Sequence, residues 1–266
     1  MPRILAFVRQ DFRTALSYRL NSLFSIGGLL ATVVPVYFIA NALQPFMARS
    51  IQSEGGEYFG FVLLGMVGLR LAIAGVGSLP GTFWSAIRTG TLESLFVTPV
   101  RPPTLVVGMM AYGLLWAAAE AAVLFAVGLA LGVRIVGAQA VMAAAILVLI
   151  TLAYVPFGIF GAALLLLFRT TGPLLNGVIV GSAMLGGIYY PTHVIPTWIG
   201  QLAAFVPLTY GLRALRQLLL ADQPLSAVAG DLAMLAAFAT VLLAASWWAF
   251  DAALRHAKRT GSLNQY

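Results

Sequence analysis

Six long apolar runs constrain the fold of this chain more than any other feature. A helix needs about 20 mostly apolar residues to cross the hydrocarbon core of a bilayer. Hydrophobic residues make up 61% of the 266 residues and charged residues only 9%, whereas about a quarter of a soluble domain is charged. This composition excludes a soluble globular enzyme. We expect one all-α membrane domain over residues 1–266 with six transmembrane helices, at residues 22–43, 58–79, 104–131, 138–168, 173–188 and 226–250.

Three other segments are too polar or too interrupted to cross a bilayer. Residues 1–20 place most of their arginines on one half of a helical wheel and most of their apolar residues on the other, which favours a helix lying in the membrane interface. Residues 82–103 combine charges with three prolines. Residues 189–225 are apolar but broken by prolines and charges, and such backbone is tolerated at membrane depth only where protein or water satisfies it. We expect two short helices there, at 196–205 and 208–221, that enter from one side without crossing.

The cations gather at the ends of the apolar runs, so the formal net charge of +7 indicates membrane topology and not a nucleic-acid partner. Six spans put both termini on one side of the membrane. The cations on that side are Arg3, Arg9, Arg13, Arg19, Arg88, Arg101, Arg169, Arg255, Lys258 and Arg259, and those opposite are Arg49, Arg134, Arg213 and Arg216. Because cytoplasmic loops are enriched in Lys and Arg, we expect both termini in the cytoplasm.

Two charges lie deep inside the predicted spans. Arg70 is about 12 residues from the outer start of its span and Glu120 about 11 residues from the outer end of the next, which at about 1.5 Å per residue gives similar depths. An unpaired charge at such a depth costs several kcal/mol. We therefore predict an ion pair between the second and third spans, serving either as a fixed bridge or as a substrate or proton site.

Two motifs carry a resemblance to a known family. Residues 88–99 read RTGTLESLFVTP, between the second and third spans. On the opposite side, the second motif comprises Tyr190-Pro191, Ile195-Pro196-x-Trp198, Pro207-Leu208-Thr209-Tyr210, Arg213 and Arg216. With these motifs the chain resembles the permease subunits of type-2 ATP-binding-cassette (ABC) transporters, which are mostly bacterial exporters.

The resemblance implies an amphipathic N-terminal helix, a cytoplasmic coupling helix within residues 82–103 and two short re-entrant extracellular helices within residues 189–225. It implies that a partner ATPase is contacted by Arg88, Gly90, Leu92, Glu93, Leu95, Phe96, Thr98 and Pro99. It implies an outer gate at Pro191, Pro196, Trp198, Pro207, Tyr210 and Arg213. Many members carry acidic residues just before the motif's glycine, where this chain has the sequence SAIRT.

The resemblance also implies partners. A second permease subunit, identical or homologous, would complete the translocation path in a bacterial plasma (inner) membrane, in contact with lipid. Lys258 is the single lysine and no glycine-rich turn precedes it, so the chain has no P-loop. ATP and magnesium are therefore expected on the partner ATPase, with no cofactor in this chain. The expected substrate is amphipathic, either a drug or a lipid-like molecule, and a lipid-linked polysaccharide stays open.

Two other functions were weighed from the residues. A membrane enzyme is disfavoured because Ser182 and His193 lack a protease motif and the eight acidic residues do not cluster. The chain has no cysteine, which excludes thiolate metal sites, and no metal site is expected. The main alternative is an ATP-independent secondary transporter or channel. Such a protein is expected to show broken helices in matched halves, whereas the broken segment here lies in the second half only.

Overall fold

The structure is a computed structural model of the chain and describes residues 19–91, 102–135, 139–168, 170, 172–194 and 196–260. Every regular element within these ranges is a helix. The elements are α2 (Arg19–Met47), η1 (Gln52–Glu54), α3 (Tyr58–Arg88), α5 (Pro102–Ala130), α6 (Ala140–Phe168), α7 (Gly172–Leu185), η3 (Thr192–Val194), α8 (Thr197–Ala203), α9 (Pro207–Leu219) and α10 (Leu225–Thr260). The predicted all-α membrane fold is confirmed at this level.

Five of the described helices, α2, α3, α5, α6 and α10, are long and apolar enough to cross a membrane. The fifth predicted span, residues 173–188, corresponds to α7, which has 14 residues. At about 1.5 Å per residue such a helix is about 21 Å long, less than the roughly 30 Å of a hydrocarbon core. By length, therefore, the described residues supply five spans and one shorter apolar helix.

Two helices run further than the sequence predicted. The second predicted span ends near residue 79, but α3 continues through Pro80 to Arg88. The Thr82 hydroxyl donates to the carbonyls of Ser78 and Met109, so the turn after the proline stays tied to its own helix and to α5. Likewise α10 continues beyond residue 250 to Thr260, and an Asp251–Arg255 ion pair on successive turns supports that extension.

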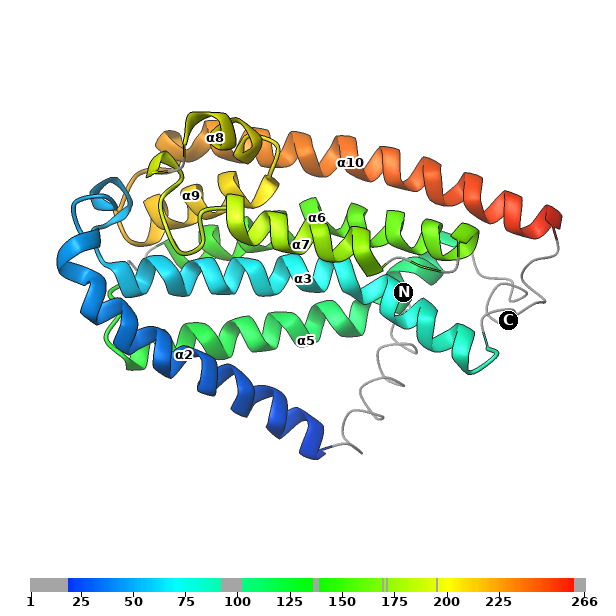
Figure 1. The fold of residues 1–266 in the computed structure, drawn as a ribbon, viewed down its shortest axis with the longest axis horizontal. Coiled ribbons are helices and arrows are strands. Elements are labelled where there is room, and N and C mark those ends of the chain that lie inside the picture. Colours follow the sequence, from blue (N-terminus) through cyan, green and yellow to red (C-terminus); the bar gives the residue numbers. More distant parts are fainter. Residues whose placement is uncertain are drawn as a thin grey trace.

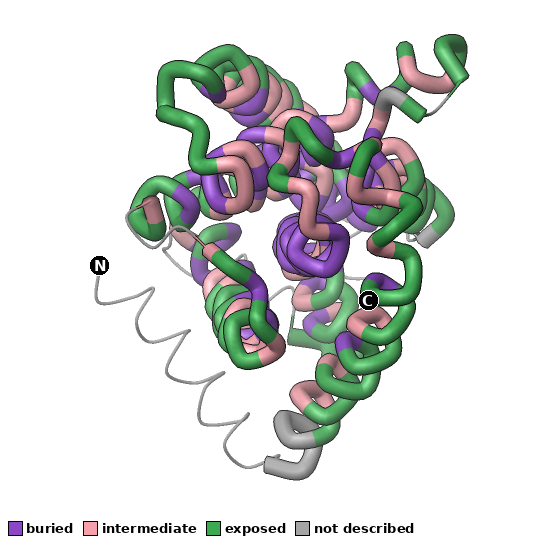
Figure 2. The backbone as a smooth tube through the Cα atoms, turned by 90° about the vertical axis from the view of Figure 1, so that its left-hand side faces the viewer, coloured by how far each residue is buried: buried purple, intermediate pink, exposed green. Residues whose placement is uncertain are grey.

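The helices run lengthwise in the bundle (Figure 1). One end holds η1, α8 and α9 with the start of α10, and is called the α9 end. The opposite end holds the last turns of α3, α6 and α10, and is called the Arg88 end. Figure 2 shows buried residues gathered in the middle of the bundle and exposed ones around it.

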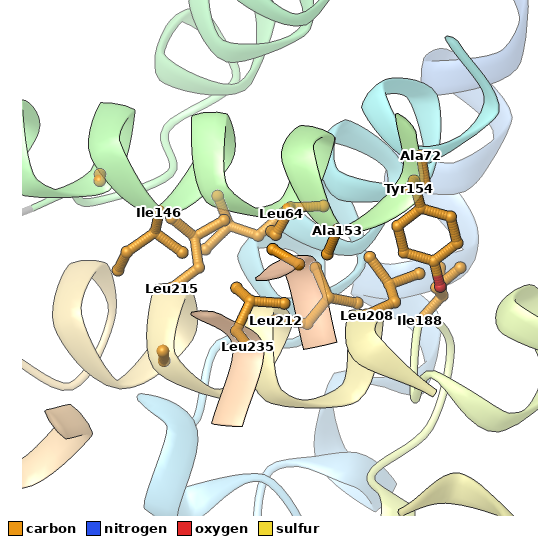
Figure 3. Packing of buried hydrophobic residues seen from close by; sticks show 14 of the residues in the cluster. Leu64, Ala72, Ile146, Ala153, Tyr154, Ile188, Leu208, Leu212, Leu215 and Leu235 are labelled. Carbon is orange, nitrogen blue, oxygen red and sulfur yellow. The ribbon is translucent and has the colours of Figure 1, made fainter. Parts of the chain in front are cut away.

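Helix α3 is the central element of the bundle. In its most apolar window 72% of the residues are buried, against 33% or less in the corresponding windows of the other four long helices. All three clusters of buried hydrophobic residues include side chains of α3. The first of them joins α3 to α6, α9 and α10, and Figure 3 shows Leu64, Ile146, Leu212 and Leu235 meeting there.

Glycine lets α3 approach α6 closely. A Cβ atom on Gly75 would lie 2.9 Å from the Cβ of Tyr154 and 3.1 Å from its carbonyl carbon. These separations are shorter than van der Waals contact, so no larger residue fits without moving a helix. In the membrane, small residues of this kind allow the close packing that holds helices together.

We expect Gly75→Val to destabilise the bundle by about 1–3 kcal/mol, because the added methyl groups force α3 and α6 apart. The thermal unfolding midpoint of the purified chain in detergent measures the effect. Gly77→Val is the matched control, since nothing lies within 4 Å of the Cβ position on Gly77. Equal midpoints for the two variants would contradict the close contact between α3 and α6.

Candidate functional site

The structure brings together the two charges that lie deep in the apolar helices. Arg70 on α3 donates from Nε to Glu120 Oε2 on α5 at 2.5 Å, and its Nη2 contacts the same oxygen. The Glu120 side chain is 1% exposed, and that of Arg70 is 35% exposed. The pair therefore joins a buried carboxylate to an arginine whose side chain is partly exposed.

Two uncharged donors complete the environment of Glu120. Its Oε1 accepts a hydrogen bond from Ser25 Oγ on α2 at 2.5 Å and from Trp116 Nε1 at 2.8 Å. The carboxylate thus ties α2, α3 and α5 to one point, and both of its oxygens are satisfied. Sequence reasoning missed both donors. Trp116 lies one helical turn before Glu120 and could have been found by that spacing, whereas no signal in the sequence points to Ser25.

A second arginine, Arg216 on α9, is buried among the elements of the α9 end. Its Nε and Nη2 donate to the carbonyl oxygen of Phe61 at 3.1 and 2.9 Å, and Nη2 also donates to Ile188 at 3.2 Å. Nη1 pairs with Glu54 Oε2 at 3.3 Å. The guanidinium carbon lies 3.4 Å from the centroid of the Phe61 ring, close enough for a cation–π contact. Arg216 therefore joins η1, α3, the segment after α7 and α9.

The charge of Arg216 persists in this setting. Burial lowers the pKa of its guanidinium to about 10, against which the nearby Glu54 carboxylate acts to raise it. The group is therefore protonated at neutral pH. The sequence contained a signal for its burial, since Arg216 follows Leu212 by one turn on the apolar face of α9.

Of the predicted outer-gate residues, the structure brings Tyr210 and Arg213 together. The Arg213 guanidinium carbon lies 5.9 Å from the Tyr210 ring centroid, and its Nη1 lies 3.3 Å from Asp231 Oδ1 on α10. The Tyr210 hydroxyl donates to the carbonyl oxygen of Ala204 at 3.0 Å. The contact between Arg213 and Asp231 thus ties α9 to α10.

The other predicted outer-gate residues lie at the ends of short elements. Pro207 is buried at the start of α9, where its fixed φ suits a first helical turn. Pro191 is also buried, whereas Pro196 precedes α8 and is exposed. Trp198 on α8 is 69% exposed, as expected of a side chain that meets lipid, a partner or substrate.

Only part of the predicted coupling segment is described. Arg88 is exposed at the end of α3, and Gly90 has φ of +66°, a conformation that favours glycine. The hydroxyls of Thr89 and Thr91 lie 2.9 Å apart across this turn. The remaining predicted contact residues, Leu92, Glu93, Leu95, Phe96, Thr98 and Pro99, lie outside the described residues. So do residues 1–18 of the predicted interfacial helix.

In the described part of the chain, no three or more His, Cys, Asp or Glu side chains lie together as a group that could hold a metal ion. The polar groups described above are instead engaged with one another and with backbone carbonyls.

The environment of Glu120 predicts unequal effects for the two members of its ion pair. We expect Arg70→Ala to destabilise the chain by about 3–5 kcal/mol, because it leaves a buried carboxylate without its cation. Glu120→Ala should cost less, since the Arg70 side chain is partly exposed. The double variant should be more stable than the sum of the two losses implies. Additive midpoint shifts in thermal unfolding would show that the two side chains are not coupled.

Helix α9 carries a buried arginine, Arg216, and a half-exposed one, Arg213, so the effects of replacing each can be compared. Arg216→Met should cost about 3 kcal/mol or more, because Glu54 and two backbone carbonyls lose a buried partner. Arg213→Met removes a half-exposed ion pair with the same 3.3 Å separation and should cost about 1 kcal/mol or less. Thermal unfolding of the two variants in the same detergent compares them. A larger loss of stability for Arg213→Met would contradict the conclusion that Arg216 makes the stronger, buried contacts between elements.

Comparison with known proteins gives one family. The model of the family described as ABC-2 type transporter matches residues 6–220, well over half of the chain. A search of curated proteins gave no match. Permease domains of this family are generally non-catalytic transmembrane components that normally work with ATP-binding subunits. With its apolar helices and this match, the chain is a multi-pass membrane protein that belongs to the ABC-2 type transporter family.

Proposed function

We propose that this chain is the transmembrane permease subunit of an ATP-driven exporter in a bacterial plasma membrane. The observation that carries the proposal is the family match, which spans the motif at residues 88–99 and most of the broken region at 189–225. The chain itself would be non-catalytic. ATP and magnesium would bind a separate ATPase subunit.

The course of the chain supports a six-span layout with both termini in the cytoplasm. The helices α2, α3, α5, α6, α7 and α10 run alternately towards and away from the α9 end (Figure 1). Helix α7 is short, but only three residues separate it from the end of α6, and it leads to the α9 end. The α9 end would then face outward, with α8 and α9 as re-entrant helices, and the Arg88 end would lie in the cytoplasm, where most cations of the sequence gather.

The Arg88 end supplies the contact with the ATPase in this proposal. Helix α3 ends with the exposed Arg88, and the turn at Gly90 lies within the motif at residues 88–99. Nucleotide binding would change the separation of two such segments. Because α3 is continuous from Tyr58 to Arg88, movement at its cytoplasmic end would reach the ion pair at Arg70. Coupling of this kind requires the ATPase to bind the inward-facing and outward-facing states with different affinity.

A second permease subunit, identical or homologous, would complete the path. The exposed face of α7 supports this, since Val180 is 56% and Met184 60% exposed, and nothing lies within 4 Å of the Cβ positions on Gly177 and Gly181. Small residues on an apolar face allow another helix to approach closely. The remaining apolar surface of the chain would meet membrane lipid.

The substrate is proposed to be amphipathic, a drug or a lipid-like molecule, with lipid-linked polysaccharide as a further candidate of the same character. The described segments at the α9 end support this class, because they consist of short helices and turns and offer no large outer domain to a folded protein. Such a substrate could enter sideways from the inner leaflet. The outer gate would comprise Tyr210, Arg213 and Trp198 with the prolines around them.

The test is co-purification of the tagged chain with an ATPase encoded beside it. Arg88→Ala combined with Glu93→Ala should weaken ATPase binding about a hundredfold or more, because each of the two charge-assisted contacts contributes about 1.5–3 kcal/mol and every 1.4 kcal/mol is tenfold. ATPase activity in the purified complex should fall in parallel.

Arg255→Ala is the matched control, an exposed arginine near the end of α10 that lies outside the coupling segment. Its complex should retain the ATPase. If no nucleotide-binding subunit accompanies the wild-type chain, and the chain alone moves substrate into liposomes without ATP, the secondary-transporter alternative replaces this proposal.

A further inference from the structure

Only one edge of the Arg70 guanidinium is occupied. Nε and Nη2 meet Glu120, while among the described residues no atom accepts a hydrogen bond from Nη1. A guanidinium has five N–H donors, so about three are left without an acceptor among the described residues. The Arg70 side chain is 35% exposed, and among the described residues none of its nitrogens is a buried atom without a hydrogen-bond partner, so these donors can be reached from outside the chain.

The free donors occupy a fixed position. Glu120 is held by Ser25, Trp116 and Arg70 together, and a carboxylate bound by three side chains cannot turn without breaking several hydrogen bonds. Its burial points the negative end of the ion pair inward and the positive end outward. Free N–H groups of a cation are costly in hydrocarbon, so this edge requires a polar partner.

An open face of α3 leads from Arg70 to the Arg88 end. Gly77, Gly81, Trp84 and Arg88 are all exposed, and their spacing of three or four residues places them on the same side of the helix as Arg70. Nothing lies within 4 Å of the Cβ position on Gly77 or Gly81. The most buried helix of the bundle thus keeps one uncovered, largely apolar strip between two arginines.

We propose that the free edge of Arg70 binds the phosphate or carboxylate group of an amphipathic ligand, whose apolar chain lies along the strip from Gly77 to Trp84. Guanidinium forks bind these two anions in a bidentate manner that neutral head groups cannot match. The ligand is either the transported substrate or an anionic membrane lipid. The inference rests on the proposed function, because it gives the charge class of an exporter's amphipathic ligand.

Octyl phosphate is the probe, with octanol as its uncharged counterpart, added to the chain in phosphatidylcholine nanodiscs. Trp116 is the reporter, because its Nε1 donates to Glu120 Oε1 at 2.8 Å. The chain has five tryptophans, so Trp198, Trp247 and Trp248 are replaced by phenylalanine, and Trp84, which lines the proposed site, is kept as a second reporter. Octyl phosphate should change the tryptophan fluorescence saturably, and octanol should not.

Two variants test the role of Arg70. Arg70→Lys keeps a cation beside Glu120 but removes the planar fork, and Arg70→Gln combined with Glu120→Gln replaces the ion pair by a neutral one that Ser25 and Trp116 still contact. Each should weaken octyl phosphate binding about tenfold or more, the equivalent of one charge-assisted hydrogen bond. The matched control is Arg255→Gln, an exposed arginine paired with Asp251, which should bind as the wild type does.

Equal binding by all variants, an equal response to octanol, or no saturable change would overturn the proposal. Adding phosphatidylglycerol to the nanodiscs separates the two sources. If phosphatidylglycerol competes with octyl phosphate, the natural ligand is a membrane lipid. If it does not compete, the natural ligand is the transported substrate. The titration needs neither ATP nor an ATPase. It can therefore fail while the partner ATPase is retained, or succeed in a chain that binds no ATPase.

Discussion

The close approach of α3 to α6 at Gly75 is the contact on which the bundle depends. Lipid tails are as apolar as leucine, so helices in a membrane associate through close packing and hydrogen bonds and gain little from the hydrophobic effect. A side chain at position 75 would move the two helices apart. Because Gly75 has none, α3 can sink into the bundle, where it contributes to all three buried clusters. The other long helices then surround it with largely exposed outer faces.

Two arginines, Arg70 on α3 and Arg216 on α9, each place a positive charge among apolar helices, and they are stabilised in different ways. Arg216 is enclosed, and its donors find two backbone carbonyls and the Glu54 carboxylate. All of these contacts hold the elements of the α9 end together. Arg70 pairs with Glu120 through Nε and Nη2, and part of its side chain stays exposed. The enclosed arginine thus fixes structure, whereas the exposed one retains the capacity to bind.

The sequence predicted the features that depend on hydrophobicity along the chain. It did not predict the features that depend on contacts with residues remote in the sequence. Apolar run length was enough to locate the long helices, and equal depth was enough to suggest that Arg70 faces Glu120. The extension of α3 beyond residue 79 could not be foreseen, because Pro80 and the charges after it usually end a helix and the compensating bond reaches across to Met109. The contact of Ser25 with Glu120 was missed for the same reason. Ser25 is 95 residues away along the chain, and no local pattern encodes such a contact.

The packing of Arg216 against Gly65 limits which substitutions the fold can accept at these positions. A Cβ atom on Gly65 would lie 3.0 Å from Arg216 Nη2 and 2.9 Å from the carbonyl oxygen of Ile188, so the arginine occupies the room that the glycine leaves. Neither position can vary independently. A side chain at 65 would require a smaller residue at 216 and movement of the backbone at Ile188, whose carbonyl oxygen is equally close, and a small residue at 216 leaves Glu54 to be neutralised as well. Three positions that are remote along the chain are therefore expected to substitute together or not at all.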